Sequence, residues 1–367
     1  MRFIDEYRSP DILRGLLDRI GDIPRPMTLM EVCGTHTMAI SRSGLRPLLA
    51  PAVDLLSGPG CPVCVTSERD MGKAVAIAGI PGVVLATFGD MMRVPGAGGT
   101  LLEAASRGAA VKVVYSPLDA LALAEREKDR KVVFLGVGFE TTAPSVAASL
   151  LRARERGVEN FYVLSLHKLV PPALRALVEM EGFGVEGFIL PGHVSSIIGA
   201  GAYSFLADEY GIPGVVAGFE PADILQAIYA LLGSREGKPS VDVAYSRAVK
   251  AGGNPRAIDI LYRVFEPADA EWRGLSFMPA SGLGIREEFR EHDAGAWEVE
   301  VPEPEEDGKC RCGDILCGLI KPPQCPMFAA VCTPDNPLGP CMVSSEGTCA
   351  SYYLYDARGG RGSWLRG

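Results

Sequence analysis

Residues 131–165 read KVVFLGVGFETTAPSVAASLLRARERGVENFYVLS and contain every element of one repeating unit. The apolar run at 132–137 has the length and composition of a buried strand. A glycine-containing turn follows, and residues 143–156 then place apolar side chains at helical spacing. A second apolar run at 161–165 completes the unit. Apolar strands that alternate with amphipathic helices are typical of parallel sheets covered on both faces.

The same unit recurs through the first two-thirds of the chain. We expect strands that end near residues 30–32, 55–56, 85–88, 113–115, 134–137, 163–165, 188–190 and 215–217. These strands fit an α/β fold of two Rossmann-like parallel-sheet domains, or a single (β/α)8-type barrel. The charged stretch at 123–131 divides them four and four. This division favours two domains, at residues 1–125 and 126–234.

The sequence pattern changes after residue 234. Helical stretches are expected at 241–264 and 285–292, and the acidic, proline-bearing segment 298–307 has the composition of a solvated connector. The tail after this connector is dense in Cys, Pro and Gly, so it can bury little apolar surface by itself. A metal centre would explain how it folds. We therefore expect a helical and Cys-rich third domain at residues 235–367.

Charge and cysteine content limit the classes of function. The net charge of -9 over 367 residues, without a cluster of Lys and Arg, argues against a general nucleic-acid binder. No uninterrupted apolar stretch fits a secretory signal or a membrane span, so we expect a cytoplasmic protein without membrane insertion. Structural disulfides are disfavoured in that compartment. The ten cysteines therefore indicate metal binding or redox chemistry.

Seven of the cysteines lie after residue 309, and none lies between residues 65 and 309. They form an upstream and a downstream group: Cys310, Cys312 and Cys317, then Cys325, Cys332, Cys341 and Cys349. Prolines and glycines among the downstream four allow bent loops to bring thiolates together, as an iron–sulfur cluster requires. The spacing matches neither the bacterial ferredoxin run nor a paired C-x2-C zinc ribbon. A cluster is favoured, and a zinc site is the main alternative.

Residues 58–64 read GPGCPVC and place two cysteines three residues apart at the expected start of a helix. Cys61 and Cys64 could form a disulfide, because a helix N-terminus stabilises the attacking thiolate. The same spacing could serve as half a zinc site, but no second C-x2-C completes one. A redox-active dithiol is favoured.

Cys33 and His36 directly follow an expected strand, in the sequence CGTHT. A thiolate and an imidazole at this spacing could share a metal or act as nucleophile and base, although the pair taken alone favours a buried thiol beside a hydrogen-bonded histidine. The pair gains weight because Cys61 follows the next strand, so both would lie at the same edge of one sheet. His193, in PGHVS, holds the corresponding place in the second half, with turn chemistry as the alternative.

Taken together, these loops resemble the HypD family of [NiFe]-hydrogenase maturation proteins. The matching segments lie at 31–37, 58–64, 88–96, 138–144, 191–195, 219–225 and 340–347. Each short match could arise by chance, but their joint order is highly specific. The resemblance implies two Rossmann-like α/β domains and a third domain that holds a [4Fe–4S] cluster.

The resemblance also implies a function. A HypD-type protein, in complex with the small chaperone HypC, would be the scaffold on which the Fe(CN)2CO group is assembled, and HypE would deliver cyanide. On this reading Cys33 binds the iron, Cys61 and Cys64 form the nearby dithiol, and His36 and His193 line the site. The family's cluster ligands map most naturally onto Cys325, Cys332, Cys341 and Cys349, which leaves Cys310, Cys312 and Cys317 without a role.

The leading hypothesis is therefore a redox-active metallocofactor scaffold rather than a stand-alone turnover enzyme. One alternative is a thiol–disulfide oxidoreductase that uses Cys61 and Cys64, with an iron–sulfur cluster as electron donor. Another is a zinc-stabilised binding module.

Overall fold

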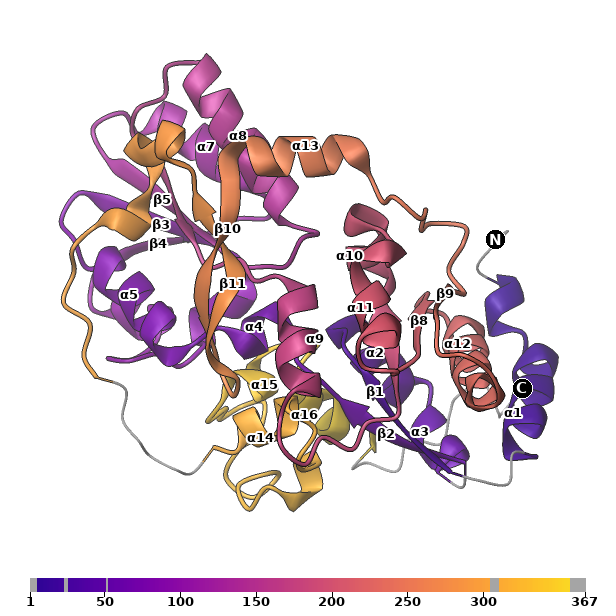
Figure 1. The fold of residues 1–367 in the computed structure, drawn as a ribbon. Coiled ribbons are helices and arrows are strands. Elements are labelled where there is room, and N and C mark those ends of the chain that lie inside the picture. Colours follow the sequence, from indigo (N-terminus) through magenta and orange to yellow (C-terminus); the bar gives the residue numbers. More distant parts are fainter. Residues whose placement is uncertain (1–4, 23–25, 51, 304–309, 357–367) are drawn as a thin grey trace.

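Two open parallel sheets form the core of the fold, in a computed structural model that describes residues 5–22, 26–50, 52–303 and 310–356 (Figure 1). The first sheet has the strand order β2-β1-β7-β8-β9, and the second has the order β4-β3-β5-β6. Every pairing in both sheets is parallel. Within the described residues neither sheet closes on itself. The α/β prediction with two Rossmann-like sheets is confirmed, and the barrel alternative is not observed.

The strands are short and mostly buried on both faces. The first sheet contains β1 (Met27–Glu31), β2 (Val53–Ser57), β7 (Gly187–Pro191), β8 (Gly214–Ala217) and β9 (Val241–Val243). The second contains β3 (Val83–Thr87), β4 (Ala110–Val113), β5 (Lys131–Gly136) and β6 (Phe161–Ser165). Side chains alternate between faces along each strand. In β3, for example, Val84 belongs to one hydrophobic core and Leu85 to the other.

The two sheets interleave along the chain. The first sheet takes strands from residues 27–57 and again from 187–243, and the second sheet takes its strands from 83–165. The expected boundary between residues 125 and 126 instead falls within the last turn of α7 (Pro117–Arg126), which connects β4 and β5 of the second sheet. The charged stretch there is a connection within one α/β unit, because α7 packs against β5.

Helices cover both faces of the first sheet. One face packs against η1 (Asp5–Arg8), α1 (Pro10–Gly21), α2 (Gly34–Arg42), α3 (Leu45–Leu49) and α12 (Pro221–Gly233). The opposite face packs against α9 (Val170–Val178), the segment with α10 (Gly192–Ile198), η3 (Ala200–Tyr203) and α11 (Ser204–Asp208), and the Cys-rich tail. The tail is therefore part of the hydrophobic core that lies under β1 and β7.

Helices also cover both faces of the second sheet. One face packs against α7, α8 (Ala143–Glu155) and α13 (Pro255–Val264). The other packs against α5 (Glu68–Ala78), α6 (Leu101–Ser106), η2 (Gly89–Arg93) and η6 (Ala294–Ala296). Between the sheets runs α4 (Pro62–Val65), which carries the C-x2-C motif.

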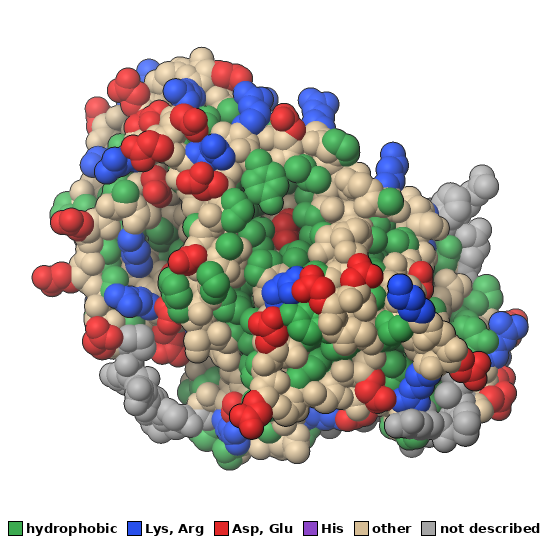
Figure 2. Space-filling model, in the orientation of Figure 1, with side chains coloured by type: hydrophobic (Ala, Val, Ile, Leu, Met, Phe, Trp, Pro, Cys, Tyr) green, Lys and Arg blue, Asp and Glu red, His purple; other side chains and the backbone are tan. Residues whose placement is uncertain are grey.

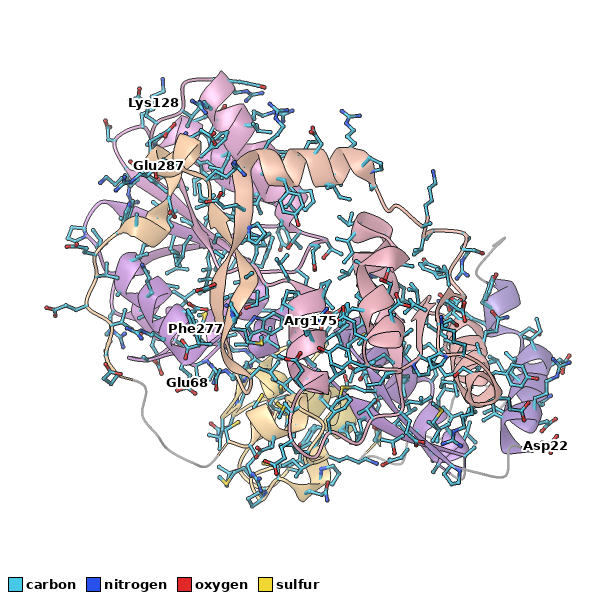
Figure 3. The ribbon with its side chains drawn as sticks, in the orientation of Figure 1. Asp22, Glu68, Lys128, Arg175, Phe277 and Glu287 are labelled. Atoms are coloured by element: carbon cyan, nitrogen blue, oxygen red, sulfur yellow. The ribbon has the colours of Figure 1, made fainter. Side chains whose placement is uncertain are left out.

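A long antiparallel hairpin, β10 (Phe265–Trp272) and β11 (Ser276–Ile285), was not expected from the sequence. The expected helix at 241–264 is also shorter than predicted, because residues 241–243 extend the first sheet as β9 and the helix begins only at Pro255. The expected helix at 285–292 is a 3-10 helix, η5 (Glu287–His292). Arg273 in the hairpin turn donates a hydrogen bond to Glu68 at 2.6 Å and so connects the hairpin to α5. Figure 3 labels Glu68 on α5 and Phe277 on the hairpin.

The tail has little regular structure, as predicted. It contains α14 (Cys312–Leu316), η7 (Pro322–Gln324), α15 (Pro340–Val343), α16 (Thr348–Ser351) and a π-helical turn, η8 (Tyr352–Asp356). In Figure 1 it forms the yellow layer below α4 and α9. Its helix α15 packs against α4, the helix of the C-x2-C motif.

In the part of the chain that the structure describes, no helix is long and apolar enough to cross a membrane. Figure 2 shows acidic and basic side chains intermixed over the visible face, which carries no large basic patch. This distribution agrees with the net charge of -9.

Candidate functional site

The candidate site lies where the strand order of the first sheet changes direction. The chain passes from β1 to β2 on one side, and β7 later adds to the other side of β1. Loops that follow two such strands diverge, and ligands in open α/β sheets bind in the resulting space. Cys33 follows β1 as the N-cap of α2, and His193 is the second residue of α10, after β7. Residues 160 positions apart in sequence thus meet at one sheet edge.

The loops that carry Cys33 and Cys61 are in direct contact, because β1 and β2 are parallel neighbours. The backbone N–H of Gly34 donates to the carbonyl oxygen of Gly60 at 2.8 Å. A Cβ atom on Gly60 would lie 2.1 Å from the Cys33 nitrogen, so only glycine allows this approach. The expectation that Cys33 and Cys61 share a sheet edge is met by this geometry.

A buried carboxyl group accepts hydrogen bonds from the Cys33 loop. Glu31 accepts the backbone N–H of Cys33 at 3.3 Å and the hydroxyl of Thr37 at 2.6 Å. Burial raises the pKa of Glu31 to about 7. Burial also raises the pKa of the Cys33 thiol to about 12, although the backbone N–H of His36 partly offsets this. Cys33 is therefore a protonated thiol at neutral pH.

Both predicted histidines stack on one aromatic ring, that of Phe219. The ring centroid of His193 lies 3.9 Å from that of Phe219, and the centroid of His36 lies 4.8 Å from it. His36 Nε2 lies 2.9 Å from the carbonyl oxygen of Gly218, so Nε2 carries the hydrogen and Nδ1 is a bare acceptor without a partner. Burial lowers the pKa of His36 to about 4, so its ring is neutral.

The Cys-rich tail reaches this site through Glu346. Thr35 donates its hydroxyl hydrogen to Glu346 at 2.6 Å, and a Cβ on Gly34 would lie 2.6 Å from the Glu346 Cβ. The pKa of His193 is lowered by burial, and the Glu346 charge acts against that shift. Glu346 therefore adds a negative charge beside Cys33 and His193.

The C-x2-C motif forms a compact pair of buried, free thiols. Cys61 is the N-cap of α4, and its Sγ accepts the backbone N–H of Cys64 at 3.3 Å. The thiol of Cys64 points toward the carbonyl oxygen of Pro340 in the tail, at 3.9 Å. Burial raises the pKa of Cys64 well above its usual range, and an interaction with Cys341 offsets part of this shift.

Cys61, Cys64, Cys341 and Cys312 form a line of thiols in which each interacts with the next. The interaction of Cys341 with Cys312 lowers the pKa of Cys341, but its hydrogen bonding to Cys64 and its burial outweigh this effect and raise the pKa well above the usual range. Cys312 in turn interacts with Cys310. The structure thus places Cys341 between Cys64 and Cys312, a position that its spacing in the sequence does not indicate.

A second group of tail cysteines lies around Cys349, whose charge also acts on Cys341 and Cys312. Burial raises the pKa of Cys349 well above its usual range, and the charges of three neighbouring cysteines add to the shift: Cys310, Cys332 and Cys325. A Cβ on Gly339 would lie 2.4 Å from Cys310 Sγ, and the N–H of Leu338 donates to Cys332 Sγ at 3.4 Å. The loop at 338–339 therefore packs against two thiols of this group.

These positions give a fit test for the expected cluster. No three His, Cys, Asp or Glu side chains among the described residues converge closely enough to hold a single metal ion. A [4Fe–4S] cluster binds each thiolate to a different iron, so its ligands lie farther apart than those of one ion. The all-thiol composition of the group suits such a cluster. The remaining tail cysteine, Cys317, donates to the carbonyl oxygen of Gly274 at 3.3 Å and belongs to neither group.

A protein-family model for HypD, described as "Hydrogenase formation hypA family", matches residues 11–356. This span includes all the candidate site residues described above. The chain belongs to the HypD family.

Relatives in this family match along almost their whole length. The hydrogenase maturation factor HypD of Escherichia coli (strain K12) is 44% identical over 366 residues, which cover 97% of this chain and 98% of the relative. The HypD proteins of Rhodobacter capsulatus and Azotobacter vinelandii are 44% and 45% identical, each over 97% of this chain and over 98% and 97% of their own lengths. A solved 2,3-dimethylmalate lyase covers 63% of this chain and 80% of its own, with 11% identity and a TM-score of 0.14, values too low to support an argument.

Three features of this HypD-family site were not assigned from the sequence. Phe219 and Glu346 lie within motifs that the sequence analysis identified, but nothing in those motifs indicates that one ring supports both histidines or that the acid reaches Thr35. Cys310 was left without a role because the family's four cluster ligands were mapped onto the downstream cysteines. Only the order of the strands places Phe219, which follows β8, beside the loops after β1 and β7.

Proposed function

We propose that this chain is a [NiFe]-hydrogenase maturation protein, a redox-active scaffold on which the Fe(CN)2CO group is assembled. The names of its relatives support a role in hydrogenase maturation. The observation that carries the proposal is the contact between the Cys33 loop and the loop of the C-x2-C motif, made by the 2.8 Å hydrogen bond from Gly34 to Gly60. This contact keeps the Cys33 loop beside the Cys61–Cys64 dithiol at the edge of the sheet. Iron bound to Cys33 would therefore lie close to redox chemistry at the dithiol.

Cys33 is the proposed ligand of the iron that the protein carries as cargo. Low-spin iron with cyanide and CO ligands suits a soft thiolate anchor. The surroundings favour this role, because Cys33 is buried, its loop is held by Glu31, and the two histidines are fixed by Phe219. The nearby histidine rings and the Glu346 carboxylate would position the iron group and exclude water from it.

Cys61 and Cys64 are the proposed redox-active dithiol. Closing a disulfide between them releases two electrons and two protons, and reopening it takes up the same number. The group of Cys310, Cys325, Cys332 and Cys349 is the proposed ligand set of a [4Fe–4S] cluster, which would supply one-electron chemistry when bound. This set has Cys310 in place of the Cys341 of the sequence-based set, because the charges of Cys310, Cys325 and Cys332 act on Cys349, whereas Cys341 hydrogen-bonds with Cys64 and Cys312. Cys341 and Cys312 would connect the two redox sites.

The proposed partners are a HypC-type chaperone and a HypE-type cyanide donor, in the cytoplasm. Family membership supports this proposal, and so does the acidic net charge, which suits protein partners better than nucleic acid. In this arrangement the chain acts as an assembly site that depends on its partners, not as an enzyme that turns over alone.

Infrared spectroscopy of the anaerobically purified complex with the HypC-type partner tests the proposal. The wild-type complex is expected to show cyanide and CO stretching bands, and Cys33→Ala is expected to lose them. Cys317→Ala is the matched control, because Cys317 is also a buried free thiol but belongs to neither group of interacting thiols. Absence of the bands from the wild-type complex, with all partners supplied, would contradict the proposed function.

A second candidate function is a thiol–disulfide oxidoreductase. The line of thiols from Cys61 through Cys64 and Cys341 to Cys312 favours it, because successive thiols can exchange a disulfide. Turnover of a small disulfide substrate by the protein without partners would support this function. If that turnover required Cys33, the oxidoreductase hypothesis would be contradicted, since Cys33 is not part of the line.

A further inference from the structure

A buried ion pair lies behind the turn at residues 218–220, which follows β8. Asp223 is 0% exposed, and its carboxylate accepts two hydrogen bonds from the guanidinium of Arg247, at 2.7 and 2.5 Å. The same carboxylate accepts the backbone N–H of Glu220 at 3.2 Å. A Cβ atom on Gly218 would lie 2.3 Å from Asp223 Oδ2, so the backbone of the turn is in close contact with this ion pair. Arg247 therefore reaches the turn through Asp223.

Tyr245 packs against the two glycines that come directly before His193 and Phe219. A Cβ atom on Gly192 would lie 2.8 Å from Tyr245 Cδ1, and one on Gly218 would lie 2.6 Å from Tyr245 Cδ2. Only glycine allows both loops to approach the ring so closely. The ring centroid of Tyr245 also lies 5.8 Å from that of Phe219, in an edge-to-face arrangement. One ring thus supports the backbones of both loops.

The Arg247 guanidinium lies between two aromatic rings, those of Tyr245 and Tyr7. Its central carbon is 4.5 Å from the Tyr245 ring centroid and 4.1 Å from the Tyr7 ring centroid. A planar guanidinium can stack on aromatic rings while its edge makes two parallel hydrogen bonds with a carboxylate, and an ammonium group cannot do both. Both Asp223 and Tyr245 contact the backbone of the turn at 218–220. Arg247 therefore supports this turn by two separate routes.

The turn at 218–220 contacts both histidines of the candidate site. The Gly218 carbonyl oxygen accepts the Nε2 hydrogen of His36 at 2.9 Å, and the Phe219 ring stacks on His36 and His193. His36 is 0% exposed, and its Nδ1 has no partner. A neutral imidazole carries one ring hydrogen, and the hydrogen bond that it makes decides which nitrogen bears this hydrogen. The position of the Gly218 carbonyl therefore sets the tautomer of His36.

We propose that Arg247 is a positioning residue that fixes the tautomer of His36 through the turn at 218–220. Its links to the turn are its hydrogen bonds with Asp223 and its stacking on Tyr245. This inference deepens the proposed function and rests on it. In that function His36 cannot donate a hydrogen bond to the iron group, because its single ring hydrogen is already used within the turn.

NMR of the histidine ring nitrogens in the anaerobically purified full chain tests this role. The sequence has four histidines, so few ring signals need assignment. In the wild type, His36 is expected to show a bare Nδ1 and an Nε2 hydrogen that exchanges slowly with solvent, because it is buried and hydrogen-bonded. Arg247→Lys keeps the positive charge beside Asp223 but cannot make the paired hydrogen bonds. It is expected to shift the two His36 nitrogen signals toward each other, as in a mixture of tautomers, with faster exchange of the hydrogen.

Arg175→Lys is the matched control. Arg175 also makes paired hydrogen bonds with an acid, Glu209, at 2.6 and 3.0 Å, and it also lies over two aromatic rings, those of Phe205 and Tyr210. It belongs to α9 (Figure 3), and none of these partners lies in the loops of the two histidines. The histidine signals of this variant are expected to match those of the wild type.

Two outcomes would overturn the role of Arg247. One is a wild-type His36 spectrum in Arg247→Lys, and the other is a wild-type His36 ring that carries its hydrogen on Nδ1. If Arg247→Lys does not fold, Asp223→Asn replaces it, since the amide has nearly the size of the carboxylate but only one acceptor oxygen. The same shifts are then expected, and an unchanged spectrum would again contradict the proposal. The NMR test needs neither iron nor a partner, so the proposed function fails separately, through missing infrared bands.

Discussion

The N-terminal and tail cysteines differ in how the fold places them. Cys33 and Cys61 follow neighbouring parallel strands, so the sheet itself determines their separation. The tail cysteines lie on short helices and loops, and their positions depend on which loops pack together. The sequence pattern can therefore predict which residues meet when they follow neighbouring strands, but it cannot predict this for residues in loops. Cys341, which the proposed ligand set leaves out, belongs to the second kind.

The largest expected effect concerns the proposed cluster ligands in the tail loops. Cys310→Ser is expected to lose the cluster, with iron and sulfide content near background, because three thiolates hold a [4Fe–4S] cluster poorly. Cys341→Ser is expected to retain wild-type iron and sulfide and the brown colour. Both are measured by metal analysis and visible absorption after anaerobic purification. The reverse pattern would support the set that the family resemblance implies, with Cys341 in place of Cys310.

The next prediction tests the contact between the Cys33 loop and the Gly60 loop, which follow neighbouring strands. Gly60→Ala is expected to destabilise the protein by about 3 kcal/mol or more, because the added Cβ meets the Cys33 backbone and the sheet cannot relax easily. Denaturant unfolding measures the loss. Gly15→Ala in α1 is the matched control, since nothing lies within 4 Å of a Cβ there. It should be neutral or stabilising by up to about 1 kcal/mol. Equal effects of both changes would argue against the close approach.

A third prediction concerns a buried acid that follows β5 in the second sheet. Glu140 accepts the N–H of Val170 at 3.0 Å, and its second oxygen has no partner. Burial raises its pKa from 4.5 to about 7, so the folded state holds a proton that the unfolded state has lost between these pH values. The contribution of this proton to the free energy of unfolding is fully present below pH 4.5 and is lost as the pH rises through 7.

Glu140→Gln stays neutral at every pH, so it should remove this loss. Relative to the wild type, its free energy of unfolding is expected to improve on the order of 1–3 kcal/mol between pH 5 and pH 8. Denaturant unfolding across that range provides the measurement. Glu287→Gln, at an exposed position, should leave the pH profile unchanged (Figure 3). A Glu140→Gln profile parallel to that of the wild type would contradict the raised pKa.

The smallest expected effect concerns Phe219, which also follows a strand. Phe219→Leu keeps a hydrophobic side chain but removes the stacking on His36 and His193. The expected cost is about 1 kcal/mol, since each aromatic pair contributes about 0.5–1.5 kcal/mol beyond its buried area. Thermal unfolding measures this cost, and NMR of the histidine rings should show both imidazoles shifted. A shift of only one ring would separate the two contacts.

Most of the fold class could be predicted from the sequence, and its connectivity could not. The strand at 131–136 and the helix at 143–155 are local patterns, set by the periodicity of their own side chains. The charged stretch at 123–131 was interpreted as a domain boundary, although it is a surface connection inside one sheet. Local charge cannot distinguish these cases, because a strand's partner depends on packing across the whole chain. The hairpin at 265–285 was missed for a related reason, since its two strands stabilise each other.

The sequence by itself determined the kinds of chemistry and the sheet edge on which the N-terminal part lies. Cys33 and Cys61 come directly after strands, and the loops at the carboxyl ends of parallel strands lie at one edge of the sheet. Only the tertiary structure decided that β7 joins β1 and that Phe219 supports both histidines. The reason is physical. Strand geometry is repeated and short-ranged, whereas contacts between distant loops depend on the side-chain packing that finally brings them together.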